Sequence, residues 1–252
     1  PGTIGTEFVA RAEPDGYTLL QTAAAHSINA SLMSKLPYDT IKSFSFISLV
    51  GTSSYVMIAN PSLPANTVPE LIALAKSKPG QLSYASTGNG GSAHLMGELF
   101  KDMAKVDIMH VPYKGLAQGL NDVASGQVQL TFSTYTGAMA YLKPGRVKAT
   151  AVTGKERMNV LPDIPTIAES GIPGFNATNW YAFVGPAKTP AKILDRWNEE
   201  IVKVLKDPDV AGQLIKHGLT PDPMTREELA KFIASESATW GAIIKERGIK
   251  VQ

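Results

Sequence analysis

A turn built of glycines, hydroxyls and an amide stands between an expected strand and an expected helix. Residues 82–86 form a short run that favours a strand, and Leu95, Met96, Leu99, Phe100 and Met103 recur at helical spacing. The turn itself, residues 86–92, is Ser-Thr-Gly-Asn-Gly-Gly-Ser. Glycines let a backbone approach a ligand closely, and the first amides of a helix lack intrahelical partners. Because the helix dipole adds positive potential there, the pattern predicts a site for a carboxylate or a phosphate.

Backbone and side-chain groups of this turn are the expected ligand contacts. We expect Ser92 also to cap the helix. His94 lies in the first turn of the helix, where it either reaches a bound carboxylate or packs under the turn. The predicted contacts are Ser86, Thr87, Gly88, Asn89, Gly90, Ser92 and His94.

A nucleotide or phosphate ligand is the alternative reading of the same residues. Residues 88–93 match the G-x-G-x-x-A fingerprint, and Asp107 follows at about the spacing of a ribose-binding acid. Asp107, however, opens the apolar run 107–111 and so lies at the amino end of that expected strand. The ribose-binding acid belongs at the carboxyl end, where Tyr113 and Lys114 stand instead. An α/β enzyme that binds a phosphate on residues 88–93 therefore remains the second hypothesis.

A second polar segment follows the expected strand 128–132. Ser133, Thr134 and Tyr135 are expected to meet the glycine-rich turn at one edge of the sheet, although helix capping by Ser133 or Thr134 is the simpler explanation. Trp180 either forms a wall of the ligand site or fills a core.

Catalytic and metal-binding patterns find no support. The four histidines have neither H-E-x-x-H nor any other paired metal-ligand spacing, and the chain has no cysteine. No G-x-S-x-G motif or close carboxylate pair supplies a nucleophile or an acid–base couple. We therefore expect a binding protein that is not an enzyme and that uses no metal and no cofactor.

Composition narrows the class of partner. The 252 residues carry 24 basic and 22 acidic side chains, spread without blocks, so we expect no nucleic-acid partner. No apolar run reaches the length of a membrane span. The first residues, Pro-Gly-Thr-Ile-Gly, are neither a signal peptide nor a natural start, so we expect a mature, trimmed or incomplete chain.

Strand and helix patterns alternate, which predicts an α/β fold with mostly parallel sheets flanked by helices. Capping boxes at Thr67/Glu70 and Thr225/Glu228 start two helices, and Thr189 is expected to cap a third that begins at Pro190. The remaining expected helices are 6–12, 116–124 and 136–142, the one after the Ser92 cap that carries the apolar positions 95–103, and a shorter one from residue 207. The expected strands are 17–21, 46–50, 55–59, 82–86, 107–111, 128–132, 148–152 and 181–184.

The order of elements predicts two lobes, the second inserted in the first. Lobe 1 comprises residues 1–53 and 180–252, and lobe 2 comprises residues 54–179, with crossing segments near residues 51–54 and 179–180. A cleft between two such lobes, lined by the carboxyl ends of strands, is the expected place for a ligand.

Short motifs occur in a fixed order along the whole chain. They are Pro14-Asp15-Gly16-Tyr17-Thr18-Leu19-Leu20, Leu36-Pro37-Tyr38-Asp39, Asn60-Pro61-Ser62-Leu63-Pro64, Ser86-x-Gly88-x-Gly90-x-Ser92-x-His94, His110-Val111-Pro112-Tyr113-Lys114-Gly115, Gly126-Gln127-Val128, Leu161-Pro162-Asp163-Ile164-Pro165-Thr166 and Pro186-Ala187-x-Thr189-Pro190. Together they resemble the motifs of one known family, the Bug or TctC-like solute-binding receptors of tripartite tricarboxylate transporters. The resemblance implies a monomeric periplasmic receptor of the type II, Venus flytrap form. It implies closure on a small organic carboxylate, such as a di- or tricarboxylate or an aromatic acid, which is delivered to the membrane components of the transporter.

The resemblance also assigns roles to particular segments. It makes residues 86–92 the carboxylate loop of the second lobe and directs residues 133–135 at the far end of the ligand. Many relatives carry an acidic residue in that second segment, so Ser133 and Thr134 favour a plain carboxylic acid over an amino acid. His26 and Asn29 retain part of a Thr-His-x-x-Asn motif and are expected contacts. Relatives begin with a strand and a Pro/Gly-rich loop that nothing before Pro1 matches, so we expect both to be absent from this sequence.

Overall fold

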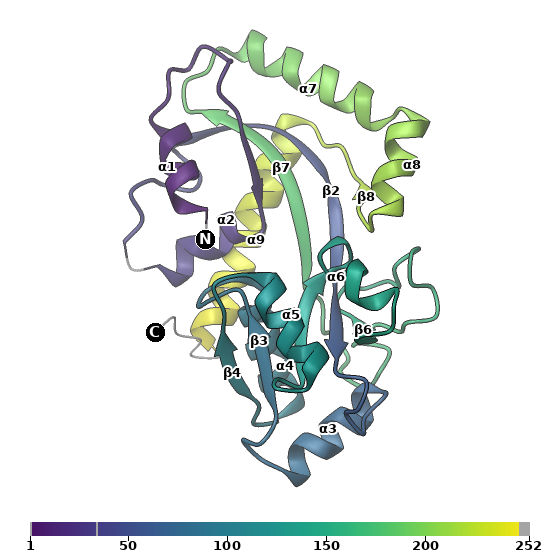
Figure 1. The fold of residues 1–252 in the computed structure, drawn as a ribbon. Coiled ribbons are helices and arrows are strands. Elements are labelled where there is room, and N and C mark those ends of the chain that lie inside the picture. Colours follow the sequence, from purple (N-terminus) through teal and green to yellow (C-terminus); the bar gives the residue numbers. More distant parts are fainter. Residues whose placement is uncertain (1, 34, 247–252) are drawn as a thin grey trace. The chain divides into compact units, whose positions relative to one another are not determined.

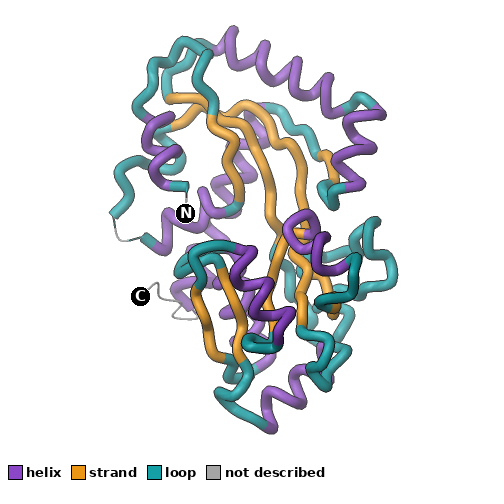
Figure 2. The backbone as a smooth tube through the Cα atoms, in the orientation of Figure 1, coloured by secondary structure: helices purple, strands orange, loops and turns teal. Residues whose placement is uncertain are grey.

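The computed structural model describes residues 2–33 and 35–246, which divide into two compact units. Unit 1 combines residues up to 52 with those from 179 onward, and unit 2 is formed by residues 53–178. Figure 1 and Figure 2 show the elements of each unit along the chain. None of the helices in the described residues is both long and apolar enough to cross a membrane.

Unit 1 contains helices from both ends of the described chain and strands from four separate segments of it. Strand β1 pairs antiparallel with β7, with Leu20 opposite Val184. Helix α2 packs against α9, and the fully buried indole of Trp180 meets Phe232 of α9 edge to face. The elements are α1 Thr3–Ala10, β1 Leu20–Ala23, α2 Ala25–Leu32, the first part of β2 Phe44–Ala59, β7 Thr178–Pro186, α7 Ala191–Leu205, α8 Pro208–Lys216, β8 Thr220–Pro221 and α9 Arg226–Glu246.

Unit 2 is a sheet with helices between its strands. Strand β3 pairs parallel with both β4 and β5, and β2 pairs antiparallel with β5 and β6. Its core includes Val56, Ile58, Ala85, Leu120 and Val123. The elements after β2 are α3 Val68–Ser77, β3 Ser83–Ser86, α4 Ser92–Ala104, β4 Met109–Pro112, α5 Leu116–Ser125, β5 Leu130–Thr134, α6 Tyr135–Leu142 and β6 Lys148–Val152.

The expected α/β class is confirmed, but the expectation of mostly parallel sheets is wrong. Parallel pairing needs a crossover connection, and the helices α4 and α5 supply one only for β3, β4 and β5. The pairings of β2 with β5, β6 and β8, and of β1 with β7, are antiparallel. The sheet is therefore mixed.

Strand β2 replaces the two short strands expected at 46–50 and 55–59. The expected interruption at Gly51 is instead a close approach, because Gly51 pairs with Pro221 and a Cβ there would meet the backbone of Thr220. Glycine at position 51 thus lets the backbones of β2 and β8 approach closely, and it does not end the strand.

Both predicted capping boxes are present, whereas the predicted Thr189 cap is not. The Thr67 hydroxyl accepts from the Glu70 amide at 3.3 Å, and Thr225 accepts from the Glu228 amide at 3.2 Å. Thr189 does not cap α7, because its hydroxyl donates to the Pro186 carbonyl at 2.9 Å. Near the amino end the patterns were displaced: α1 spans Thr3–Ala10 instead of 6–12, and β1 spans Leu20–Ala23 instead of 17–21.

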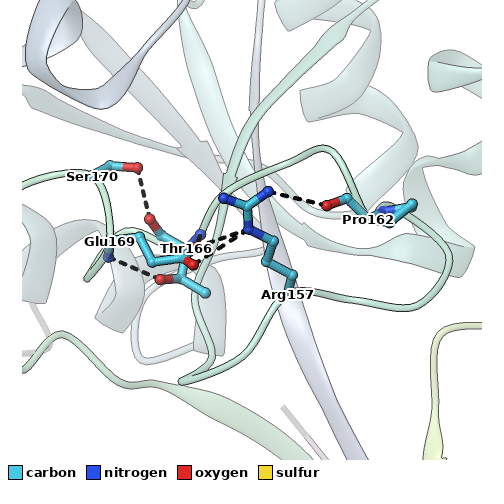
Figure 3. Close-up of polar contacts among 5 residues, drawn as sticks. All are labelled: Arg157, Pro162, Thr166, Glu169 and Ser170. Atoms are coloured by element: carbon cyan, nitrogen blue, oxygen red, sulfur yellow. Dashed lines mark hydrogen bonds and ion pairs between the residues drawn. The ribbon is translucent and has the colours of Figure 1, made fainter.

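The long connection from β6 to β7 is fastened by polar contacts (Figure 3). Glu169 accepts from the Thr166 amide at 2.7 Å, and the Thr166 hydroxyl accepts from the Glu169 amide at 2.9 Å, so the two residues cap each other. Arg157 pairs with Glu169 at 3.1 Å and donates to the Pro162 carbonyl at 3.2 Å. These bonds give an irregular segment a defined course.

Candidate anion-binding site

The glycine-rich turn of unit 2 joins the end of β3 to the start of α4, as predicted. Gly88 and Gly90 have φ angles of 110° and 76°, a left-handed region that side chains with a Cβ rarely adopt. The Gly91 amide donates to the Gly88 carbonyl at 3.2 Å and closes the turn. Residues 86–92 thus form a compact loop whose shape depends on glycine, and we call it the anion loop.

Helix α4 begins one residue earlier than expected. Gly91 is the N-cap, since its carbonyl accepts the first intrahelical bond, from the Leu95 amide at 3.1 Å. Ser92 is therefore the first helical residue, and the expectation that its side chain caps α4 is wrong. The amides of Ser92, Ala93 and His94 precede that first bond and have no acceptor within the helix. Together with the helix dipole they make this end of α4 suited to a carboxylate.

The Ser86 hydroxyl is committed to bonds inside the loop. It lies 3.1 Å from both the amide nitrogen and the carbonyl oxygen of Gly88 and 2.6 Å from His110 Nε2. Ser86 is 4% exposed. Its side chain therefore shapes the anion loop, and Thr87 and Asn89 are the exposed polar side chains there.

Two histidines lie beneath the anion loop. The Gly90 amide donates to His94 Nδ1 at 3.1 Å, so His94 packs under the loop, which was one of its two predicted positions. The rings of His94 and His110 stack with centroids 4.1 Å apart. Burial lowers the pKa of His94, and burial together with the neighbouring His94 lowers the pKa of His110 to about 4.

The carboxylate of Glu98 lies near this histidine pair, and its charge is compensated by Lys101. Glu98 of α4 accepts from the Tyr84 hydroxyl and from Lys101 Nζ, each at 2.8 Å. Burial alone would raise the pKa of Glu98, but the hydrogen bonds from Lys101 and Tyr84 lower it. Glu98 is thus held as a carboxylate paired with Lys101.

The sequence alone did not reveal the part that His110 plays. His110 falls within the strand expected at 107–111, and it does lie in β4. Its approach to Ser86 follows from the parallel register of β3 and β4, in which Tyr84 is opposite His110. The two ends of this strand are as expected. Asp107 lies before β4, and Tyr113 follows it, with its amide donating to the Ser86 carbonyl at 2.9 Å.

The second polar segment lies at the same edge of the unit 2 sheet. Strands β3 and β5 run parallel, with Ala85 opposite Thr131, so their carboxyl ends lie at the same edge of the sheet. The segment after β5 therefore leaves the sheet at the edge where the anion loop follows β3. Thr134 caps α6 by accepting from the Gly137 amide at 3.3 Å, and the Ser133 hydroxyl donates to the Thr134 carbonyl at 3.1 Å. Tyr135 is the first residue of α6 and is partly buried. Capping therefore accounts for Thr134.

The three remaining predicted contacts lie in unit 1. His26 and Asn29 are buried on α2, and His26 Nε2 bonds to the Thr40 carbonyl at 2.7 Å. Burial lowers the pKa of His26. Trp180 is fully buried and donates from Nε1 to Glu236 at 3.1 Å, so the core alternative describes its position.

Among residues 2–33 and 35–246 no group of three or more potential ligand side chains is arranged to hold a metal ion. The anion loop offers hydrogen-bond donors and a favourable helix dipole, and its Ser86 hydroxyl, next to His110, is buried and bonded within the loop. What this arrangement can do chemically is to bind an anion.

The chain resembles known proteins along its whole length. It is 32% identical to BugT of Bordetella pertussis over 253 residues, which cover 100% of this chain and 78% of that protein. A solved R. palustris protein, Rpa4515 with adipate, superposes with a TM-score of 0.93 at 31% identity, covering 99% of this chain and 84% of the other. MatC from Rhodopseudomonas palustris, solved with bound malate, superposes with a TM-score of 0.86 at 28% identity, covering 96% and 84%.

The periplasmic binding protein BugD superposes with a TM-score of 0.89 at 33% identity, covering 100% of this chain and 85% of the other. These likenesses define the class of protein, a periplasmic solute-binding protein and not an enzyme. The sequence profile described as "Tripartite tricarboxylate transporter family receptor" matches residues 1–249. The chain belongs to this family, TctC, and the family suggested by its motifs is confirmed.

Proposed function

We propose that this receptor captures a small organic carboxylate in the periplasm and presents it to the membrane components of a tripartite tricarboxylate transporter. The observation that carries the proposal is the anion loop, which ends in three helical amides that have no acceptor within the helix. Two relatives that superpose closely on this chain were solved with adipate and with malate, both carboxylic acids.

The ligand carboxylate would accept hydrogen bonds from the amides of Ser92, Ala93 and His94. Left-handed Gly88 and Gly90 shape the loop that leads into these donors. The hydroxyls of Ser92 and Thr87 add two more hydrogen-bond donors, which are neutral and do not titrate near neutral pH. Backbone donors recognise the carboxylate group that many organic acids share. Since Ser133 and Thr134 provide no negative charge for an ammonium group, we propose a plain carboxylic acid as the ligand.

Isothermal titration with adipate and malate tests the proposal directly. Inorganic phosphate, adenosine monophosphate and a neutral amino acid serve as comparison ligands. A carboxylate receptor binds at least one of the two acids and none of the three comparison ligands. Binding of the nucleotide or phosphate alone would contradict the proposal and favour the alternative hypothesis of a phosphate site.

The variant Ser92→Ala locates the site. A hydrogen bond to a charged group contributes roughly 1.5–3 kcal/mol, so affinity should fall by about ten-fold or more. Because Ser92 does not cap α4, the substitution should leave stability nearly unchanged. Ser125→Ala, on a helix of the same unit, is the matched control and should bind as wild type. Equal affinities of the two variants would remove Ser92 from the site.

We further propose that the receptor acts as a monomer. Light scattering coupled to size exclusion, with and without the carboxylate, should give a mass close to the 26.9 kDa of this chain. A mass of twice that value would contradict this part of the proposal.

A further inference from the structure

The stacked His94 and His110 lie directly under the anion loop and each is bonded to it. His94 is 6% exposed, and its ring lies at an interplanar angle of 25° to that of His110. Neither side chain has a place in the proposed set of ligand donors, which on the side of α4 consists of backbone amides and a hydroxyl. Their contacts need another explanation.

The bond from Gly90 fixes the protonation of His94. The Gly90 amide donates to Nδ1 at 3.1 Å, so Nδ1 must carry a lone pair and the ring proton of a neutral His94 lies on Nε2. An imidazolium has N–H groups at both nitrogens and accepts no hydrogen bond. Protonation of His94 would therefore break the bond to Gly90 and turn two donors toward each other.

The contact between Ser86 and His110 is compatible with either protonation state of His110. The Ser86 hydroxyl lies 2.6 Å from His110 Nε2, and a hydroxyl can donate to a bare ring nitrogen or accept from an N–H. When His110 is protonated, Nε2–H donates to the hydroxyl, whose own proton is then directed at the Gly88 carbonyl at 3.1 Å. This contact therefore survives in both the neutral and the protonated ring. Of the pair, only His94 loses its loop contact on protonation.

The surroundings favour the neutral form of His94 at neutral pH. The titratable groups that face it are Glu98 and Lys101 on α4, Tyr84 on β3 and His110 on β4. Burial lowers the pKa of His94, and Lys101 acts in the same direction while Glu98 opposes it. Because Glu98 is already paired with Lys101, it compensates an imidazolium only weakly.

We propose that neutral His94 is a positioning residue, which anchors the Gly90 amide and holds the anion loop in its carboxylate-binding form. This inference rests on the proposed carboxylate site. It predicts that carboxylate affinity falls as His94 takes up a proton in mildly acidic solution. A His94 that touched the ligand as a cation would give the opposite sign, since affinity would then rise on acidification.

The pH profile of wild type and two variants tests the inference. In His94→Asn the side-chain oxygen stands near the place of Nδ1 and accepts from Gly90 but does not titrate, whereas Leu in His94→Leu accepts nothing. Titrations with adipate and malate at pH 8 to 5 should show wild-type affinity falling by up to about ten-fold per pH unit below the His94 pKa. His94→Asn should match wild type at pH 8 within about three-fold and keep only the ligand's own pH dependence, and His94→Leu should bind weakly throughout. Identical profiles for wild type and His94→Asn, or rising affinity in acid, would overturn the inference.

A measurement on the ligand-free wild-type protein separates this inference from the proposed function. Nitrogen-15 NMR should show the Nε2–H tautomer of His94 at pH 8, and the Gly90 amide resonance should shift with the titration of that ring. A Gly90 resonance that does not follow His94 would refute the anchoring role even if carboxylates bind. Coupled titration without binding of either acid would instead refute the proposed ligand class.

Discussion

Gly97 of helix α4 lies against the ring of Tyr84, and a methyl group added at this position should lower the stability of the fold. A Cβ at Gly97 would lie under 3.0 Å from three atoms of the Tyr84 ring, Cδ2, Cε2 and Cζ. The ring has little room to move because Tyr84 is 1% exposed, stacks with His110 at 5.0 Å and donates to Glu98 at 2.8 Å. Gly97→Ala must therefore displace the helix or the ring.

The magnitude follows from two opposing effects. Overpacking a buried site costs about 1–3 kcal/mol. Replacing a helical glycine by alanine contributes about 1 kcal/mol in the other direction. We expect Gly97→Ala to lower the free energy of unfolding by about 1 kcal/mol.

Gly212→Ala on α8 is the matched control. A Cβ at Gly212 would meet nothing within 4 Å, so only the helix-propensity gain of about 0.5–1 kcal/mol applies. Urea denaturation followed by circular dichroism should thus separate the two variants by about 2 kcal/mol. Stability changes that agree within about 0.5 kcal/mol would refute the packing argument.

A double-mutant cycle identifies the ring as the cause. In a Tyr84→Leu background the three crowding ring atoms are gone, so Gly97→Ala should become neutral or stabilising. The coupling energy between the two sites should be about 2 kcal/mol. A coupling near zero would mean that Gly97→Ala acts through the helix itself.

Two further substitutions in unit 1 test the packing of β2 and the burial of a carboxyl group. Gly51→Ala would place a Cβ against the Thr220 backbone, so it should separate β8 from β2 and cost about 1–3 kcal/mol in urea unfolding; unchanged stability would contradict this. Burial raises the pKa of Glu236, so the folded state binds its proton more tightly than the unfolded state, and stability is lost as pH rises from about 4.3 through the raised value. Glu236→Gln keeps an oxygen acceptor for Trp180 and should therefore be more stable than wild type at pH 7, with the difference vanishing below about pH 4. A difference independent of pH would argue against burial as its cause.

The local part of the site could be predicted from the sequence. The apolar spacing of Leu95, Leu99 and Phe100 identified the buried face of α4, and the glycines before it identified the turn. Such features depend on neighbours within a few residues, which the sequence displays directly. The cap position was displaced by one residue because Gly91 and Ser92 are both acceptable at an N-cap.

Contacts between distant segments could not be predicted in this way. His110 meets Ser86 only because β3 and β4 pair parallel in one particular register, and nothing local specifies which strands pair. The same holds for the antiparallel partners of β2, which turned an expected parallel fold into a mixed sheet. For Trp180 the sequence allowed a ligand wall or a core, and its bond to Glu236, 56 residues along the chain, shows why the pattern could not decide.

The insertion of one unit within the other has a consequence for the order of folding. Every residue of unit 2 lies in one continuous segment, 53–178, so its contacts close as soon as that segment is available. Unit 1 instead packs α2, Ala25–Leu32, against α9, Arg226–Glu246, and the Ser27 hydroxyl reaches the Ile233 carbonyl at 3.5 Å. At about 5–20 residues per second, synthesis leaves α2 without this partner for some ~10–40 s. The core of unit 1 is thus completed last, by a helix made after all of unit 2, and the residues of α2 that are buried in the finished protein lack their α9 partner during that interval.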